Sequence, residues 1–118
     1  MSLTVYEQNM NPFIAMNRFQ VVKGHEQEFE AIWKNRTTYL EKIPGFQQFN
    51  LLKGPNLEDF TLYASHTLWD SERHFDDWTK SEAFRKAHEG AGSRGHLYRN
   101  HPHFEGFEVV KGTRVVSI

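Results

Sequence analysis

The first regular pattern along the chain is an alternation of apolar and polar positions. Residues 12–22, PFIAMNRFQVV, repeat with a period of two, which predicts a β-strand. One face of this strand would carry Phe13, Ala15, Asn17, Phe19 and Val21, and the other Ile14, Met16, Arg18, Gln20 and Val22. The first face is apolar except at Asn17, and a buried amide without a hydrogen bond costs on the order of 1–3 kcal/mol. Asn17 is therefore a candidate functional residue.

The pattern then changes to helical spacing. Apolar residues recur at intervals of three and four between His25 and Ile43, which predicts a helix that Pro44 and Gly45 end. The elements predicted after this helix are a strand at 46–52, a turn at 54–56 and a strand at 60–69.

Two short helices are predicted within residues 68–90. Ser71, or the aspartate before it, can cap the first helix, and Ser81 can cap the second. One unbroken helix would set Trp78 and His88 about 15 Å apart along its axis and on different faces. A break at Ser81 instead allows both side chains to face one cleft. The second helix carries an apolar stripe that ends in an imidazole, made of Ala83, Phe84, Ala87 and His88.

The C-terminal part of the chain predicts a loop between strands. Residues 89–103 contain three glycines, two arginines and three histidines, and we expect a mobile loop there. A fourth strand is predicted at 104–111 and a short closing strand at 113–118. Residues 1–11 are polar and are expected to trail or to pair at a sheet edge.

The order strand, helix, strand, strand, helix, strand is the ferredoxin-like split βαβ pattern of an α+β fold. It predicts an antiparallel sheet with both helices on one face, in a single domain over residues 1–118 whose core spans roughly 12–111. The first strand is apolar on both faces, so the second sheet face also needs cover. We therefore expect a symmetric homodimer in which two sheets pack face to face, a dimeric α/β barrel.

Composition narrows the classes of function. The 14 basic and 15 acidic side chains give a net charge of −1, which argues against nucleic-acid binding. The absence of cysteine excludes disulfides and thiolate metal sites and fits a reducing compartment. No apolar run approaches the roughly 18 residues of a membrane span, and no signal peptide is recognised, so we expect a cytoplasmic protein with no membrane association. The 17 aromatic residues suit a large core, a flat ligand or an apolar subunit interface.

Three segments together resemble a known family: NRF at 17–19, PGF at 44–46 and TLWDSERHFDDWTKSEAFRKAH at 67–88. Over roughly residues 12–111 the chain resembles the antibiotic-biosynthesis monooxygenase (ABM) domain. Within that family it is similar to the haem-degrading monooxygenases of the iron-regulated surface determinant type. The functional asparagine, tryptophan and histidine of that subfamily match Asn17, Trp78 and His88.

The resemblance implies a role for each of these residues. His88 would be the axial ligand of the haem iron, and Asn17 would lie on the distal side and hydrogen-bond an iron ligand. Trp78 would press on the porphyrin and distort it, and Phe84 would belong to the haem-binding wall. Haem would be both substrate and cofactor, and its ring would be opened with O₂ and electrons from an external reductase, which releases iron.

A flat apolar macrocycle needs walls lined by rings with few polar groups, and neutral imidazole is a common axial ligand. Each residue also has a structural interpretation: a lone histidine at a helix end is usually structural or exposed, and a tryptophan is usually core. Arg94 and Arg99 are candidate contacts for the haem propionates. The loop histidines 96, 101 and 103 give only a weak metal-site signal.

Two other classes of function use the same fold. One is a cofactor-free ABM monooxygenase acting on a polyphenolic or quinol substrate, and the other is a haem-binding protein without turnover. A Soret band on mixing with hemin separates the first from the haem-dependent functions. Loss of that band with a reductant and O₂ separates an enzyme from a carrier.

Overall fold

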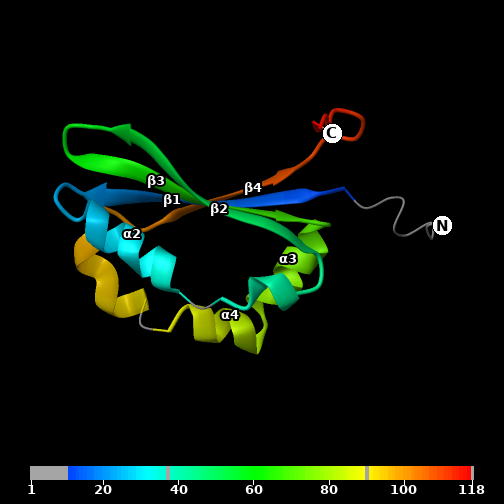
Figure 1. Ribbon diagram of the computed structural model, residues 1–118, viewed down its shortest axis with the longest axis horizontal. Helices are drawn as coiled ribbons and strands as arrows, with labels where there is room; N and C mark the ends of the chain where they lie inside the picture. Colours follow the sequence, from blue (N-terminus) through cyan, green and yellow to red (C-terminus); the bar gives the residue numbers. More distant parts are fainter. Residues whose placement is uncertain (1–10, 37, 90, 118) are drawn as a thin grey trace.

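The computed structural model describes residues 11–36, 38–89 and 91–117, which form an antiparallel sheet covered on one face by helices (Figure 1). In chain order the elements are β1 (Phe13–Val22), α2 (Glu26–Asn35), the 3₁₀ helix η1 (Leu40–Lys42), β2 (Phe46–Asn56), β3 (Phe60–Trp69), α3 (Glu72–Thr79), α4 (Glu82–Ala87), the 3₁₀ helix η2 (Ala91–Leu97) and β4 (His103–Glu108). The strand order β2-β3-β1-β4, with every neighbouring pair antiparallel, confirms the predicted ferredoxin-like α+β fold. Within the part of the chain that the structure describes, every helix is too short or too polar to span a bilayer.

The inner face of the sheet carries two separate apolar clusters. The first contains the buried residues Phe13, Ala15, Leu40 and Trp69, and the second contains Phe19, Val21, Phe29 and Tyr63. The alternation predicted for the first strand is confirmed, because its inner residues are buried except for the half-buried Asn17, which lies between the two clusters. On β3 the same interval is occupied by Ser65 and Thr67. The core is therefore divided where the inner face carries small and polar side chains.

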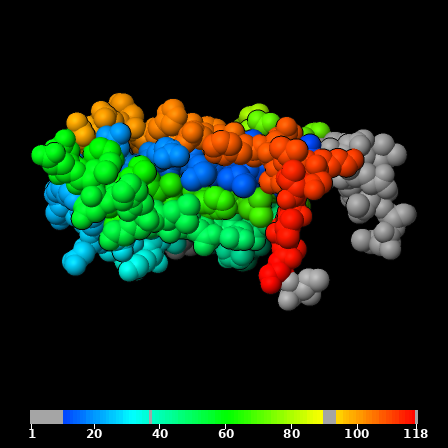
Figure 2. Space-filling model, turned by 90° about the horizontal axis from the view of Figure 1, so that it is seen from above, coloured from blue at the N-terminus to red at the C-terminus, as the bar shows by residue number. Residues whose placement is uncertain are grey.

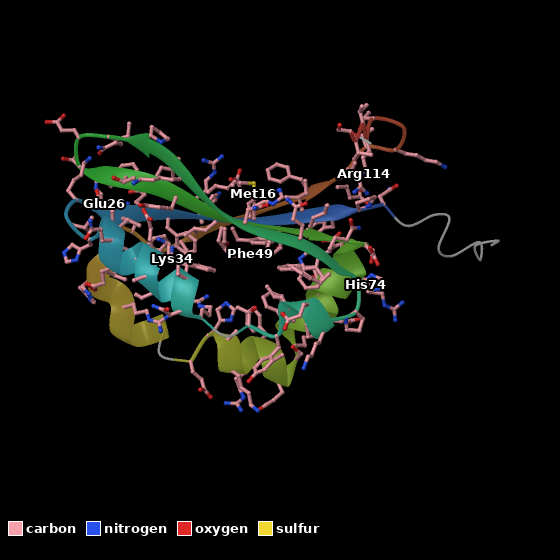
Figure 3. All side chains as sticks on the ribbon, viewed as in Figure 1. Met16, Glu26, Lys34, Phe49, His74 and Arg114 are labelled. Atoms are coloured by element: carbon pink, nitrogen blue, oxygen red, sulfur yellow. The ribbon has the colours of Figure 1, made fainter. Side chains whose placement is uncertain are left out.

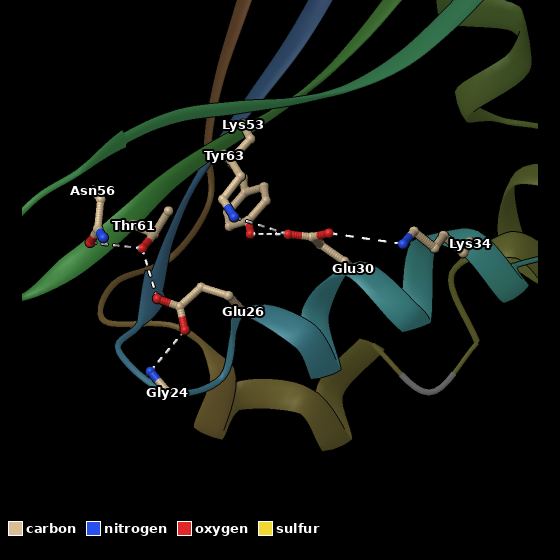
Figure 4. Close-up of polar contacts among 8 residues, drawn as sticks. All are labelled: Gly24, Glu26, Glu30, Lys34, Lys53, Asn56, Thr61 and Tyr63. Atoms are coloured by element: carbon tan, nitrogen blue, oxygen red, sulfur yellow. Dashed lines mark hydrogen bonds and ion pairs between the residues drawn. The ribbon is translucent and has the colours of Figure 1, made fainter.

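Helix α2 is attached to β3 by carboxylates on its inner side (Figure 4). Glu26 accepts hydrogen bonds from the Gly24 amide and from the Thr61 hydroxyl, each 2.8 Å long. One turn later, Glu30 accepts a hydrogen bond from the Tyr63 hydroxyl, and this bond lowers the pKa of Glu30. Because Thr61 and Tyr63 are buried, these contacts satisfy polar groups that would otherwise be stranded inside the protein.

The break predicted at Ser81 is confirmed. Ser71 caps α3 by accepting a hydrogen bond from the His74 amide, and Ser81 caps α4 by accepting one of 3.1 Å from the Phe84 amide. The Ser81 hydroxyl also donates to the Trp78 carbonyl over 2.6 Å, so it joins the end of α3 to the start of α4. His88 is the C-cap of α4.

The single helix predicted from His25 to Ile43 was wrong in its second half. Helix α2 ends at Asn35, Arg36 is extended, and Tyr39 has a left-handed backbone with φ of 58° before η1 begins. Threonine and tyrosine are weak helix formers, so little holds the helix together after Asn35. The turn at Tyr39 directs Leu40 into the core, where it is 5% exposed.

The turn predicted at 54–56 lies instead at 57–59, because β2 continues to Asn56. A register shift between Lys53 and Asn56 accommodates Gly54 and Pro55. Proline is tolerated here because β2 is an edge strand, where a missing ladder donor costs little. The expected turn at Pro44 and Gly45 is present, and Gly45 has φ of +84°, a conformation that favours glycine.

The loop predicted at 89–103 is correct only in part: residues 91–97 form η2, followed by a β-bridge between Tyr98 and Val21, and residues 99–102 lack helix and strand. Leu97 is fully buried and anchors this segment against the sheet.

The fourth strand ends at Glu108 instead of residue 111. The closing strand is also wrong, since residues 113–117 are exposed and form no strand. Among the described residues, strand β1 begins at Phe13, so pairing with β4 ends near Glu108, where the Val109 amide still donates to the Pro12 carbonyl over 2.8 Å. The prediction for residues 1–10 lies outside the described residues.

The helices of the described residues all lie on one side of the sheet (Figure 1), which leaves the strands exposed on the outer face (Figure 2). Met16 lies on this side of the sheet and Phe49 on the helical side (Figure 3). The β3 residues on the outer face are Phe60, Leu62, Ala64, His66 and Leu68. On β4 the outer face adds Phe107, which is 46% exposed. The outer face therefore carries half-buried and exposed apolar side chains beside the Arg18–Glu105 ion pair.

We expect Ser81→Ala to lower the free energy of unfolding by about 1 kcal/mol, because it removes the N-cap of α4 and the link to Trp78. Urea denaturation of both proteins measures this difference. Ser81→Asp retains a capping oxygen and is the matched control, which should lie close to wild type. Equal stabilities of the alanine and wild-type proteins would contradict the role assigned to the cap.

Candidate functional site

The interval between the two clusters is a cavity of about 210 Å³. The sheet contributes Ala15, Asn17, Ser65, Thr67, Phe49 and Phe104 to its lining, and the helical layer contributes Trp33, Phe75, Trp78, Phe84, Ala87 and His88. Most of these groups are apolar or aromatic, with few polar atoms among them. Such a lining is typical of a site for a flat apolar ligand.

A second cavity of about 450 Å³ adjoins the first on the side of η2. Asn17, Trp33, Arg36 and His88 line both cavities, so the two are parts of one cleft. The second part adds Phe19, Arg94, Gly95, Tyr98, His101 and Pro102. The cleft is thus lined by aromatic side chains throughout, and its second part, the basic end, adds Arg94 beside Arg36.

The His88 imidazole is held in one orientation. Its Nδ1 lies 2.8 Å from the Phe84 carbonyl oxygen, and Nδ1 must donate there because a carbonyl can only accept. Nε2 is then the unprotonated nitrogen of the neutral ring. Burial lowers the pKa of His88 below the ordinary 6.5, and the nearby Arg36 charge lowers it further, although the bond to Phe84 opposes both effects. At neutral pH the ring therefore offers Nε2 as a lone-pair donor.

Trp78 and Phe84 surround this imidazole with aromatic rings. The Phe84 ring stacks on His88 with centroids 4.0 Å apart, and its edge meets Trp78 at 4.8 Å. The centroids of Trp78 and His88 are 6.1 Å apart, so the break between α3 and α4 brings them together as predicted. Trp78 also packs on the fully buried Trp69 at 5.4 Å, which restricts its movement.

Asn17 reaches the cleft from the sheet. On β1 it is paired with Ser65 of β3 on one side and with Phe104 of β4 on the other. The Phe104 ring stacks on Phe75 with centroids 5.5 Å apart. The sheet side thus presents one amide among rings, whereas His88 enters from the helical layer. The structure therefore brings Asn17, Trp78, Phe84 and His88 to a single cleft.

Two arginines lie at the basic end of the cleft. Arg36 stacks on the Trp33 ring, 4.1 Å from its centroid, and burial and then the neighbouring Arg94 charge lower its pKa. Arg94 Nη1 is buried without a hydrogen-bond partner. Among the described residues, no carboxylate lies within ion-pair distance of either guanidinium. Two half-buried cations without a counter-ion form a ready site for an anionic group.

Trp33 and Arg36 are not among the residues predicted for the site. Trp33 lines both cavities, and its indole nitrogen is buried without a partner among the described residues. Arg36 follows the end of α2 and also lines both cavities, within the stretch that was predicted to be part of a longer helix. Arg99 lies outside the cleft, 3.6 Å from Asp59. Only Arg94 of the two suggested arginines lines it.

Comparison with known proteins places these residues in a family. The family model described as "Antibiotic biosynthesis monooxygenase" matches residues 12–90. A staphylobilin-producing heme oxygenase of Staphylococcus saprophyticus is 31% identical over 78 residues, which cover 66% of this chain and 74% of that protein.

Solved structures resemble the fold. MhuD, a heme degrader of Mycobacterium tuberculosis solved with two hemes in its active site, is 30% identical with a TM-score of 0.64, covering 83% of this chain and 95% of that one. A Bacillus cereus protein described as an antibiotic biosynthesis monooxygenase has a TM-score of 0.70 at 18% identity, covering 90% and 99%. The chain therefore belongs to the antibiotic biosynthesis monooxygenase family.

Proposed function

We propose that this protein is a haem-degrading monooxygenase that opens the porphyrin ring and releases iron, using O₂ and electrons from an external reductase. The observation that carries the proposal is the convergence of Asn17, Trp78 and a neutral His88 on one aromatic cleft. The identity to a heme oxygenase and to MhuD supports it. Bound haem would supply the iron that activates O₂, so no protein nucleophile is required.

The residues of the cleft fit haem in three respects. Nε2 of His88 is available to ligate iron, because Nδ1 is engaged by the Phe84 carbonyl. The stacked Phe84 ring restricts rotation of the imidazole and so positions that ligand. The rings of Phe75, Trp78 and Phe104 provide apolar walls for the macrocycle.

The arginines favour haem over a neutral quinol. Haem carries two propionates, and Arg36 and Arg94 offer guanidinium groups that have no counter-ion among the described residues. A neutral polyphenol would leave both cations unpaired in a half-buried site, at a cost in binding free energy. The cofactor-free alternative therefore gains no support from this end of the cleft.

Asn17 and Trp78 would act on turnover more than on binding. An amide donor that reaches the cavity from the sheet can stabilise charge that develops only during the reaction. Trp78 is packed against Trp69 and Phe84 and cannot easily move aside, so a flat ligand entering beside it would bend.

We also propose a homodimer joined through the outer face of the sheet. Leu62 and Leu68 lie on this face beside the buried Ala64, and Phe107 is 46% exposed there. A sheet apolar on both faces needs cover on both, and a second copy of the same face is the simplest complementary surface.

We expect the protein to give a Soret band on titration with hemin, and the band to disappear when a reductant and O₂ are added. His88→Ala should raise the hemin Kd at least about tenfold, since even groups that only support a metal ligand typically contribute that much. It should also abolish ring opening. A Soret band that persists after reductant and O₂ are added would identify a haem-binding protein without turnover. The absence of any band would favour the cofactor-free quinol monooxygenase instead.

The pH dependence of binding separates ligation from simple hydrophobic capture. Protonation of His88 removes the lone pair on Nε2, so wild-type affinity should fall as the pH drops through the lowered pKa of His88, below 6.5. His88→Ala should show no such step. A step of the same size in both proteins would assign it to another group.

Replacing Arg36 and Arg94 by methionine should weaken hemin binding about tenfold or more per residue, because a charge-assisted hydrogen bond contributes about 1.5–3 kcal/mol. Hemin dimethyl ester lacks the propionate charges and should bind the double variant at least as tightly as wild type. Arg73→Met, an exposed change on α3 outside the cleft, is the control. An equal loss of affinity for hemin and its ester would contradict propionate recognition.

For the dimer, light scattering at micromolar concentration should give twice the monomer mass. Met16→Glu places a charge in the centre of the outer face and should produce monomers. Gln27→Glu adds the same charge on the exposed side of α2 and should leave the dimer intact. A wild-type protein of monomer mass would refute the proposed assembly.

A further inference from the structure

Outside the cleft, two histidines and a glutamate from separate segments meet at one point. His25 directly precedes α2, Glu28 lies in its first turn, and His96 belongs to η2, which lies beside the start of α2 (Figure 1). His96 Nε2 is 2.8 Å from one oxygen of Glu28, and His25 Nδ1 is 3.7 Å from the other. The three potential ligand atoms all lie within 4.8 Å of one another.

We propose that His25, Glu28 and His96 bind a divalent first-row transition metal ion of the Zn²⁺, Co²⁺ or Ni²⁺ type. Two imidazoles and one carboxylate are a common donor set for these ions, and water can complete the coordination. Atoms that ligate a tetrahedral ion at about 2.1 Å lie about 3.4 Å apart, so the side chains need to draw together by little more than 1 Å. All three are partly exposed, at 38%, 46% and 56%, which leaves them free to make this adjustment.

An ordinary ion pair accounts for only part of this arrangement. The 2.8 Å contact with His96 already engages one oxygen of Glu28. The His25 ring nevertheless turns its Nδ1 toward the other oxygen, and the two imidazole centroids lie only 5.6 Å apart. Two imidazole nitrogens and one carboxylate thus face a common point, which is the arrangement that a single metal ion requires.

The proposed metal site lies beside the cleft and would restrain η2, which contributes to the cleft lining. A metal ion would cross-link η2 to α2, and η2 carries Arg94 and Leu97. Arg94 and Glu28 line the same surface hollow as Arg36, which itself lines the main cleft. Metal binding would therefore hold the segment that supplies one of the two cleft arginines. The site itself uses none of the haem-binding residues and does not depend on the proposed function.

The experiment is a titration of the untagged, haem-free full chain with Co²⁺, followed by visible ligand-field absorption, and with Zn²⁺, followed by calorimetry. We expect saturation at one ion per chain. His25→Ala, Glu28→Gln and His96→Ala should each weaken binding at least about tenfold, the minimum expected for loss of a direct ligand. Zn²⁺ should also raise the Tm of wild type and not that of His96→Ala, because an ion that binds only the folded state stabilises it.

His103→Ala is the matched control, since His103 is an exposed histidine on β4 outside the cluster, and it should bind like wild type. Mg²⁺, which prefers oxygen ligands, should not compete. Far-UV circular dichroism checks that each variant is folded. Absence of stoichiometric binding, wild-type affinity in His96→Ala, or an equal loss in His103→Ala would each overturn the proposal.

Discussion

The cleft depends on the spacing of large and small side chains along the inner face of the sheet. Aromatic clusters at both ends hold the helical layer away from the strands, and between them Ser65 and Thr67 are too small to fill the space. Packed interiors rarely tolerate such a void, so a cavity with a built aromatic lining points to a ligand. Asn17 lies in this interval, which explains how an amide is accommodated in an otherwise apolar row.

The helical side of the cleft depends on two serine caps. Helices α3 and α4 have eight and six residues, lengths at which an isolated helix is unstable in water. Ser71 and Ser81 satisfy their first amides, and aromatic packing on Trp69 supplies the remaining stabilisation. The break that Ser81 produces brings Trp78 and His88 to 6.1 Å between ring centroids, where one straight helix would have separated them.

The positive charge of Arg36 affects the chemistry of the cleft. Burial is the main cause of the lowered pKa of His88 and the Arg36 charge adds to it, so the cation that would attract a propionate also favours the neutral imidazole. Stacking of Arg36 on Trp33 offsets part of the cost of half-burying a guanidinium by about 0.5–2 kcal/mol. In the proposed function, Arg36 would therefore couple recognition of a propionate to ligation of the haem iron.

Local patterns in the sequence determined the fold class, the first strand and the two capped helices, and they singled out Asn17, whereas the family resemblance implied Trp78, Phe84 and His88. Alternation, helical spacing and capping act between near neighbours and can therefore be read from the chain. Only the tertiary structure decided the end of α2, the helical η2 and the roles of Trp33 and Arg36 as lining residues. Likewise, the sequence drew attention to histidines 96, 101 and 103, whereas folding places His96 beside His25 and Glu28, about 70 residues away. Contacts between residues far apart in the sequence depend on how the helices pack on the sheet, so they cannot be predicted from local sequence patterns.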